Sequence, residues 1–534
     1  DMTDWNPAEM IGLYPKPLSI SLYEYLITNK TWAKARAMIG YKDMSSEKLM
    51  VSLAGHPFIN VRNSFNSLIP AGLSKKIEDR LINYYLQKLN KSPFLHDKVE
   101  FDILFSCYTP KTEIDLCKLE KEGFSKKEIQ TLSKDLKNLT INILENPKLS
   151  IQKQLNKVQI LDEKYLEIIE NNEKYDLNTI LNICIKYGTL PFSILARYAF
   201  IASQILKDME KIGQLSSESV NKFFNSIETI ASESSAMYDD VQNGNLSLDI
   251  FLKKFGHLRP GTYDLMQPRY DAAPDKYFNL KNTKNITHAR SENFTEKLYI
   301  KNFNKNELFL IENYLRSISQ NLTIEKFIIF LVESIRGREY AKFQFSKIIS
   351  HSLEIIKRIG DKHNIDKNNL VFLKINEIKA LSKQNSKDLK LKLQKKLEIR
   401  KNKFNVYKQI KLPSFINKLD DIKFFTLFYD KPNFITNKII TCESKYIKNL
   451  QDNLSIDGKI ILIDNADPGF DWIFSHNPSG LITAWGGANS HMAIRAAELQ
   501  IPSVLGVGDV LYQKWLGAKR LYVNCLTQKV EIIK

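Results

Sequence analysis

The chain has 534 residues, of which 43% are hydrophobic and 26% are charged, and its formal net charge is +17. A chain of this length exceeds what a single hydrophobic core can organise, so we expect two to four domains. No apolar run approaches the ~20 residues that a membrane span requires and the first residues carry no signal-peptide pattern, so we expect a cytoplasmic protein without a membrane span.

The excess positive charge lies largely in lysine-rich stretches such as residues 383–411, where good helix formers predict a helix with a solvated lysine face. A basic protein can bind nucleic acid. Because the whole chain is rich in Lys, Asn and Ile, however, we expect no nucleic-acid partner. The five cysteines form no Cys-x-x-Cys pair and the eight histidines show no metal-ligand spacing, which predicts buried free thiols and no zinc site.

The first segment of the chain ends in an Asn-Pro pair. Asp4 lies two residues before Asn6, and Pro7 follows. An acidic residue at this distance from Asn-Pro resembles the last metal-binding strand of ATP-grasp domains, which implies that Asp4 and Asn6 hold Mg²⁺ on the phosphates of ATP. An ordinary Asx-Pro turn is the alternative. We interpret residues 1–18 as the tail of an ATP-grasp domain, and we expect the missing ATP-grasp portion in cis or as a separate chain.

Residues 19–424 predict a large, mainly helical domain. Apolar residues recur at helical spacing in stretches such as 77–86 and 327–335. Residues 49–53 and 99–105 have the pattern of short strands. Between residues 118 and 174 the chain is polar, with leucines three and four residues apart, which predicts long surface helices.

Residues 55–70 carry several donors suited to an amino-acid carboxylate or a phosphate. Among them Arg62 is the candidate substrate-binding residue, because a guanidinium can clamp a carboxylate with two parallel hydrogen bonds. Structural turns use the same residue types, which is the alternative for the other members of this run.

The run 254–271 combines two glycines and two prolines with charged residues of both signs. Polar clusters on such irregular loops mark functional sites, so this loop is a candidate acceptor site. His257 is the candidate general base, and Arg259 or Arg269 would neutralise charge on a transferring phosphoryl group. Tyr263 and Asp264 complete the predicted substrate-binding set. A structural ion network formed by Arg259, Asp264 and Arg269 is the alternative.

A domain boundary is expected between residues 412 and 433, where the lysine-rich helical pattern stops. Residues 425–534 alternate strands with short helices, as in a compact α/β domain. This domain contains the most informative motif of the chain, a glycine loop that becomes a helix at residue 491.

The glycine loop has the features of a phosphohistidine site. Gly486 and Gly487 remove side chains where an anion would approach the backbone, and Ser490 can cap the helix that begins at His491. The free N–H groups of the first helical turn would face a phosphate, and this positive helix end would keep His491 neutral and nucleophilic. Arg495, one turn later, is a candidate phosphate ligand, with simple solvent exposure as the alternative.

From the strand at 460–464 through Asp467-Pro-Gly-Phe-Asp-Trp472 to Gly506, the chain resembles the swivelling phosphohistidine domain of phosphoenolpyruvate-utilising enzymes. Asn489 stands where the family often has Thr, and the helix arginine is displaced by two positions. The resemblance implies that His491 carries the phosphoryl group and that the domain moves between two active sites.

Two further resemblances suggest an acceptor. The run 254–271 resembles the acceptor domain of rifampin phosphotransferases. Together with residues 55–70 and 95–102, it also resembles capsule-associated L-glutamine kinases of phosphoramidate biosynthesis. The second resemblance implies ATP-dependent phosphorylation of the glutamine amide nitrogen with release of AMP and phosphate. The 43 residues after His491 leave no room for a phosphoenolpyruvate-binding barrel, so ATP is the expected donor.

The sequence therefore predicts a multidomain α+β protein, with a large mainly helical acceptor domain followed by a C-terminal α/β swivelling phosphohistidine domain. The predicted function is an ATP-dependent, dikinase-type phosphotransferase that acts on L-glutamine and uses Mg²⁺. The alternatives are a rifampin phosphotransferase-like or phosphoenolpyruvate synthase-like small-molecule kinase and, in another class, a non-catalytic fragment or regulatory binding protein.

Overall fold

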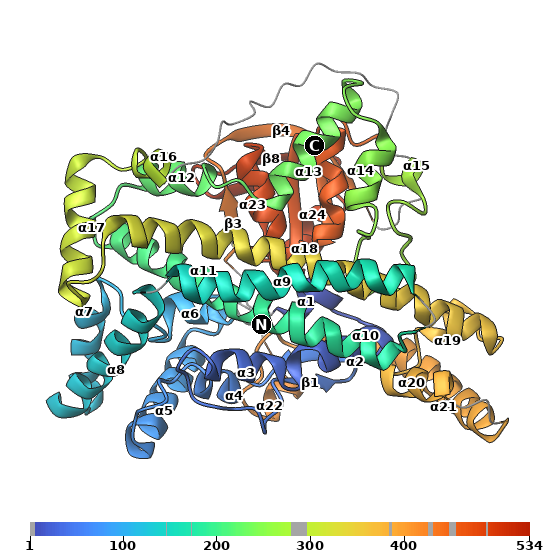
Figure 1. Cartoon of the computed structure of the whole chain (residues 1–534), viewed down its shortest axis with the longest axis horizontal. Helices are drawn as coiled ribbons and strands as arrows, with labels where there is room; N and C mark the ends of the chain where they lie inside the picture. The colour runs from blue at the N-terminus through green and yellow to red at the C-terminus, as the bar shows by residue number, and fades with distance from the viewer. Residues whose placement is uncertain are drawn as a thin grey trace.

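A computed structural model describes residues 6–145, 147–171, 174–278, 296–383, 387–425, 431–447, 455–487 and 490–533. In these ranges a layer of long helices runs across the molecule, and the C-terminal sheet lies on one side of this layer (Figure 1). The helices up to residue 278 are α1 (Pro7–Ile11), α2 (Pro17–Tyr23), α3 (Thr31–Ala37), α4 (Val61–Asn66), α5 (Lys75–Lys91), α6 (Val99–Asp102), α7 (Thr112–Leu116), α8 (Lys126–Leu144), α9 (Pro147–Glu170), α10 (Leu177–Cys184), α11 (Leu190–Lys211), α12 (Ser217–Asn225), α13 (Ile230–Gln242), α14 (Leu248–Phe255) and α15 (Pro274–Tyr277).

The helices after residue 295 are α16 (Glu296–Ile300), α17 (Lys305–Ile318), α18 (Ile324–Lys362), α19 (Lys367–Leu370), α20 (Ile375–Lys383), α21 (Lys387–Tyr407), α22 (Asp420–Lys423), α23 (His491–Glu498) and α24 (Gly508–Leu516). Short 3₁₀ or π segments are η1 (Glu24–Thr28), η2 (Pro93–Leu95), η3 (Cys117–Glu122), η4 (Ile185–Thr189) and η5 (Pro468–His476). The strands are β1 (Met50–Leu53), β2 (His56–Ile59), β3 (Asn433–Ile435), β4 (Ile439–Tyr446), β5 (Ile460–Asn465), β6 (Gly480–Trp485), β7 (Ser503–Leu505), β8 (Arg520–Asn524) and β9 (Lys529–Ile533).

Local sequence signals account for several helix starts. Ser125 and Glu128 form a reciprocal capping box at the start of α8, as the Ser-x-x-Glu pattern favours. Thr323 caps α18, whose 39 residues span about 58 Å at 1.5 Å per residue. The predicted helices between residues 118 and 174 are confirmed as α8 and α9, and the lysine-rich helix is confirmed as α21.

One of the two predicted short strands is confirmed and the other is wrong. Residues 50–53 of the predicted stretch 49–53 form β1, which pairs antiparallel with β2. Residues 99–105 instead begin with α6, because Val99 and Ile103, four residues apart, are both buried on one helix face. Tertiary packing overrides the weak alternating pattern there, and the buried Glu100 of α6 pairs with Arg197 of α11.

The central layer consists of α9, α11 and α18, which pack against one another (Figure 1). In the described part of the chain, one helical run, Leu177–Lys211, is long and apolar enough to cross a membrane. Of its most apolar window, 61% is buried inside the protein, as is typical of a core helix.

The C-terminal sheet has the strand order β3-β7-β6-β5-β4-β8-β9. The four strands β4 to β7 run parallel, and the flanking strands β3, β8 and β9 are antiparallel to their neighbours. Alternate residues of β5 face opposite sides: Ile461 and Ile463 pack toward α23, whereas Ile460 and Leu462 pack toward α24. Helices therefore cover both faces of the parallel strands, as the α/β prediction requires.

The core under α23 continues into the helical part of the chain. Trp472 of η5 contacts Tyr277 of α15, with ring centroids 6.0 Å apart, and the same apolar cluster includes Phe255 of α14 and Phe343 of α18. The C-terminal sheet is therefore docked on α13–α15 and α18 in this structure. The domain limits 1–18, 19–424 and 425–534 stay predictions.

All five cysteines are free thiols, as predicted. Cys107, Cys184 and Cys525 are buried and Cys442 is half-buried. Cys117 is exposed, against the prediction, because it begins the surface segment η3.

Candidate functional site

The glycine loop follows β6 at the carboxyl end of the parallel strands, where ligands bind in open α/β sheets. Gly486 has φ 140°, and a Cβ atom there would overlap the Ala466 side chain, so the position requires glycine. Ser490 Oγ accepts the Ala493 N–H at 3.2 Å, which confirms the predicted cap of α23. Residues 488–489 and the side chain of His491 lie outside the described part of the structure.

Helix α1 lies against this loop. The Gly487 N–H lies close enough to the Glu9 carboxyl group to lower the pKa of that group. Asn6 Oδ1 accepts the Glu9 N–H at 3.2 Å and so caps α1, with Pro7 in the first turn. The N-terminal segment therefore reaches the glycine loop directly.

One of the two predicted Mg²⁺ ligands lies outside the described part of the chain. Asp4 lies outside the described part of the chain, and Asn6 keeps one oxygen lone pair beside its capping bond. Among the described residues, no group of three or more His, Cys, Asp or Glu side chains could hold a metal ion. Mg²⁺ binding by Asp4 and Asn6 stays a prediction.

Helix α18 places two basic residues close to Glu9. Lys342 is 8% exposed, and within the described part of the chain its ammonium group has no hydrogen bond or ion pair. Arg338 lies one helical turn earlier on the same face. The charges of Lys342 and Arg338 both lower the pKa of Glu9, against a larger upward shift caused by burial of its carboxyl group.

A second carboxyl group, that of Asp467, completes the cluster. Its Oδ1 atom accepts N–H bonds from Gly469 at 2.7 Å and from Gly261 at 3.1 Å. Burial raises the pKa of Asp467, and the positive charge of Lys342 opposes that shift. We call Glu9, Arg338, Lys342 and Asp467 the loop-facing cluster, and it combines side chains from α1, α18 and the turn before η5.

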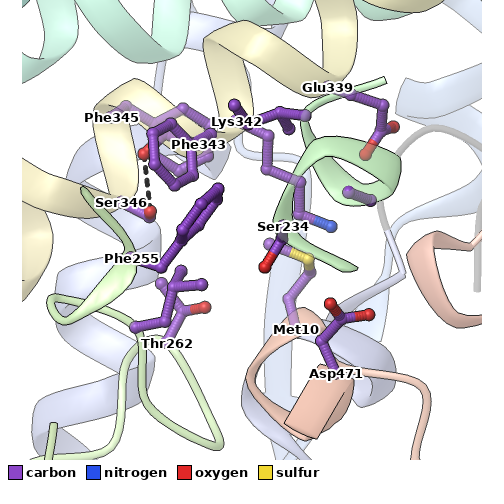
Figure 2. A pocket seen from close by; sticks show the side chains of 13 residues that line it. Met10, Ser234, Phe255, Thr262, Glu339, Lys342, Phe343, Phe345, Ser346 and Asp471 are labelled. Atoms are coloured by element: carbon purple, nitrogen blue, oxygen red, sulfur yellow. Dashed lines mark hydrogen bonds between the residues drawn. The ribbon is translucent and has the colours of Figure 1, made fainter. Parts of the chain in front are cut away.

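A cavity of about 40 Å³ lies beside this cluster. Figure 2 shows Lys342 extending from α18 toward Ser234 and Met10, with Asp471 of η5 beyond them. Its walls come from α1, α13, α18, η5 and the 254–271 loop, so both halves of the molecule form it. A second pocket of about 260 Å³ adjoins it, since Ser234 and Asp471 line both.

The predicted general base His257 is buried behind the cavity wall. Its Nε2 atom lies 3.0 Å from Ser346 Oγ, and Ser346 donates its own proton to the Phe343 carbonyl oxygen at 2.7 Å. Nε2 is therefore the donor to Ser346 and has no lone pair that could take a proton. Burial, together with the charge of Lys347, lowers the pKa of His257 well below its usual range. This arrangement does not favour the predicted role as base.

Two predicted acceptor-loop residues make structural contacts. Arg259 donates to Glu354 Oε1 at 2.9 Å and to Ser350 Oγ at 3.1 Å, and it is 3% exposed. Arg269 forms a two-bond ion pair with Asp271. These contacts favour the ion-network alternative for both arginines.

Asp264 and Tyr263 also depart from the predicted arrangement. Asp264 Oδ1 accepts the Met266 N–H at 2.9 Å in an Asx turn, so it stands apart from that ion network. Tyr263 is 1% exposed and packs edge-to-face on Tyr23, with centroids 5.4 Å apart. Tyr263 is therefore a core side chain, because the hydrophobic cluster of the helical layer surrounds its ring.

Arg62 and Arg495 lie in different settings. Arg62 is exposed on α4, which lies across the helical layer from the C-terminal sheet (Figure 1), so the structure does not bring it to the acceptor loop. Arg495 is 1% exposed and donates to Asp471 at 2.9 Å and Glu498 at 2.8 Å. It is neither solvent-exposed nor turned to the loop, since it ties α23 to η5. Phosphate binding by Arg495 stays a prediction.

The docked position of the C-terminal domain depends on a close backbone approach at Gly469. A Cβ atom there would overlap the carbonyl oxygen of Arg259, and Tyr270 Oη donates to the Gly469 carbonyl oxygen at 2.9 Å. Gly469→Ala is expected to weaken docking by about 1–3 kcal/mol through overpacking. Small-angle X-ray scattering should show a larger radius of gyration, and amide exchange at Gly261 should accelerate.

Gly517→Ala is the matched control for this prediction. Gly517 ends α24, and none of the described atoms lies within 4 Å of the added methyl group. An unchanged radius of gyration and unchanged amide exchange in Gly469→Ala would contradict the docking role of this contact.

The loop-facing cluster was missed by reasoning from the sequence, although weak signals for it exist. Arg338 and Lys342 are basic residues four positions apart in α18, so helical periodicity places both charges on one face. Glu9 stands two residues after the Asn-Pro pair, in the first turn of the helix that Asn6 caps. The contact between these segments depends on the tertiary fold.

Comparison with known proteins agrees with this geometry. Residues 455–528 match the family model for the mobile domain of PEP-utilising enzymes. A rifampicin phosphotransferase of Bacillus cereus is 24% identical over 283 residues, which cover 49% of this chain and 31% of that protein. One from Bacillus subtilis is 23% identical over 280 residues, which cover 48% of this chain and 31% of that protein.

The chain thus spans less than a third of the length of these curated relatives. Residues 455–528, with the Gly486–His491 loop among them, are similar to the mobile domain of PEP-utilising enzymes, and about half of the chain is similar to phosphotransferases.

Proposed function

We propose that this chain is the acceptor and phosphohistidine part of an ATP-dependent phosphotransferase, in which His491 carries a phosphoryl group from ATP to a small acceptor. The observation that carries this proposal is the contact between the glycine loop before His491 and the loop-facing cluster. A phosphorylated His491 in this position would lie at the N-terminus of α23, where backbone N–H groups favour an anion.

The glycine loop, helix α18 and the Asp467 turn have different roles in this proposal. The first turn of α23 and the Gly487 N–H bind phosphoryl oxygens, and the Glu9 carboxyl group lies near Gly487 in the present state. Lys342 and Arg338 from α18 stabilise charge on the phosphoryl group during transfer. The Asp467 turn holds the C-terminal domain on the acceptor loop. ATP with Mg²⁺ supplies the phosphoryl group, and the domain must swing between the ATP site and the acceptor site.

The acceptor that we propose is L-glutamine, phosphorylated on its amide nitrogen with release of AMP and phosphate. The two adjoining pockets support a small acceptor, because their volumes of about 40 and 260 Å³ are below the range of sites for drug-sized ligands. Lys342 and Glu339 line the smaller pocket, and such opposite charges suit a zwitterion. The resemblance of residues 55–70 and 254–271 to L-glutamine kinases supports the same choice.

A rifamycin-like acceptor is the second candidate, favoured by the similarity to rifampicin phosphotransferases. It would need a wide apolar cleft, and the smaller pocket would have to open considerably. A non-catalytic binding protein is the candidate from another class. In a non-catalytic protein the buried charge of Lys342 would have no function, although burying a charge is energetically costly.

The experiment that tests this proposal supplies the complete enzyme, including an ATP-grasp portion, with magnesium ATP and one acceptor at a time. Phosphorus NMR should show a phosphoramidate signal with glutamine and none with glutamate, which lacks the amide N–H donors. Turnover with a rifamycin and none with glutamine would replace glutamine by the second candidate. No turnover with any acceptor, and no phosphorylated protein, would contradict the relay itself.

A further inference from the structure

The two pockets beside Lys342 meet at a junction formed by one residue from each half of the molecule. Ser234 of α13 and Asp471 of η5 line both pockets. Ser234 is 9% exposed, and its hydroxyl group makes no hydrogen bond to another residue in the part of the chain that the structure describes. Asp471 is held in place by Arg495, whose Nε atom donates to its Oδ1 atom at 2.9 Å. The junction is therefore complete only while the C-terminal domain is docked.

The volumes of the two pockets indicate how an amino acid would be divided between them. The smaller pocket, of about 40 Å³, has room for one or two water-sized groups, since a water molecule occupies about 30 Å³ of liquid. The larger pocket, of about 260 Å³, has room for several such groups. A terminal amide group therefore fits the smaller pocket, whereas the head of an amino acid, with its ammonium and carboxylate groups, needs the larger one.

The smaller pocket presents two opposite charges among apolar side chains. Lys342 extends into it, and its ammonium group has no hydrogen bond or ion pair within the described part of the chain (Figure 2). Glu339 lines the same pocket. A carboxamide group also matches these charges, because its oxygen accepts from an ammonium group and its N–H groups donate to a carboxylate. Met10 of α1 completes the wall on the side of the glycine loop, so an amide in this pocket would lie near that loop.

The larger pocket favours a positively charged group. Asp239 of α13 and Asp471 line it, and none of the described residues in its wall is Lys, Arg or His. Because Asp471 is paired with Arg495, Asp239 supplies negative charge to the contents of this pocket. The side-chain amides of Gln242 and Asn477 also line it and can donate to a carboxylate. An α-ammonium group at Asp239, with the α-carboxylate at the side-chain amides, fits this arrangement.

We infer that the acceptor amino acid lies across both pockets, an inference that rests on the proposed function. Its α-ammonium group pairs with Asp239 in the larger pocket, and its side chain passes Ser234 into the smaller pocket. There the amide oxygen accepts from Lys342, and the amide nitrogen lies on the side of the glycine loop, where His491 would present the phosphoryl group. Asp239 and Ser234 are thus specificity-determining residues, since the first selects the ammonium group and the second admits a side chain of the right length.

The role of Asp239 is tested by steady-state kinetics of the complete enzyme with magnesium ATP and two acceptors, glutamine and 4-carbamoylbutanoate, which lacks the ammonium group. Wild type should prefer glutamine by about 10–100-fold in kcat/KM, because the analogue brings no positive charge to the Asp239 carboxylate. Asp239→Asn should raise KM for glutamine by about 10–100-fold with little change in kcat, and it should abolish the preference. A merely structural role of Asp239 would lower kcat/KM for both acceptors equally.

Asp240→Asn is the matched control for this variant. Asp240 is the next residue of α13, and it lines neither of the two pockets. The control should keep the wild-type KM for glutamine and the wild-type preference over the analogue.

The passage at Ser234 is tested with isolated phosphorylated enzyme in a rapid-quench apparatus. Ser234→Leu fills the junction, so transfer to glutamine should slow by about 10²-fold or more, because the amide no longer reaches the phosphoryl group. Ser234→Ala leaves the passage open and should lose no more than about 10-fold. Ala236→Leu, on the same helix but in the wall of neither pocket, is the control for added bulk and should transfer normally. Melting temperatures check that each variant is folded.

The length of the acceptor gives a test that needs no variant. Asparagine is one methylene shorter than glutamine, so its amide should stop short of the smaller pocket when its ammonium group is at Asp239. Wild type should transfer to asparagine about 10²-fold more slowly than to glutamine.

The outcomes distinguish this inference from the proposed function. An Asp239→Asn enzyme that keeps the wild-type preference for glutamine, or a wild type without that preference, overturns the assignment of the ammonium group. A folded Ser234→Leu enzyme that transfers at the wild-type rate, or asparagine that reacts as fast as glutamine, overturns the position across both pockets. Each of these results leaves the relay and the proposed acceptor intact. A wild-type enzyme that never transfers to glutamine contradicts the proposed acceptor instead.

Discussion

Replacing His491 by Asn is expected to abolish phosphorylation of the protein by ATP and, with it, all turnover of the acceptor. Asparagine can occupy the first turn of α23 and leaves the Ser490 cap in place, so the fold should be retained. It has no nucleophilic nitrogen of the imidazole type. The measurement is acid-labile, base-stable radiolabel on the complete enzyme after incubation with magnesium ATP.

The matched control for this variant is His476→Asn, because His476 is a histidine of the same domain that lies in η5, away from the glycine loop. It should keep its label. Label that persists in His491→Asn would show that another residue carries the phosphoryl group, and the relay assignment would then be wrong.

The second large effect is expected at Lys342. Lys342→Ala should lower the rate of transfer to the acceptor by about 10²–10³-fold, the usual cost of losing one preorganised charge at a transition state. Phosphorylation of His491 should remain, since that reaction takes place at the ATP site. Rapid-quench measurement of the two half-reactions checks both statements.

The thermal stability of Lys342→Ala gives an independent test of the role of this residue. Removing the buried ammonium group relieves a desolvation cost, but it also removes a positive charge that stabilises the buried Glu9 and Asp467 carboxylates. The melting temperature of Lys342→Ala should therefore stay within a few degrees of wild type. Lys357→Ala, at an exposed position of the same helix, is the control and should transfer normally. A clear loss of stability together with loss of both half-reactions would make Lys342 structural and contradict its role in transfer.

Much of the C-terminal domain could be predicted from the sequence, because its signals are local. The strand at 460–464, the Asp-Pro turn, the glycine loop and the cap at Ser490 each depend on residues close together in the chain. Gly486 in particular has φ 140°, a backbone conformation that glycine tolerates and other residues rarely adopt. Such constraints act within one turn and are visible in the residue types.

The acceptor side was harder to predict, because its contacts join segments hundreds of residues apart. A charged residue on an irregular loop looks the same whether it binds a substrate or another side chain. Arg259 pairs with Glu354, 95 residues away, and no local pattern reveals the position of that partner. Tyr263 is placed in the core by its packing on Tyr23, 240 residues away in sequence.

The loop-facing cluster was hard to predict for the same reason. Glu9 and Lys342 lie far apart in the sequence. In the structure both lie close to the glycine loop, near residue 487. Helical periodicity places Lys342 on a buried face but does not say which element covers that face. The structure therefore adds residues that the sequence left unassigned.

The relay through His491 is tested most directly by a chase of isolated phosphorylated enzyme. The complete enzyme is labelled from radioactive ATP, freed of nucleotide and mixed with glutamine, and the label on the protein and on small molecules is followed in time. The account predicts that label leaves the protein at the rate at which phosphoramidate appears, one for one. Label that stays on the protein, while phosphoramidate forms only when ATP is present, would contradict it.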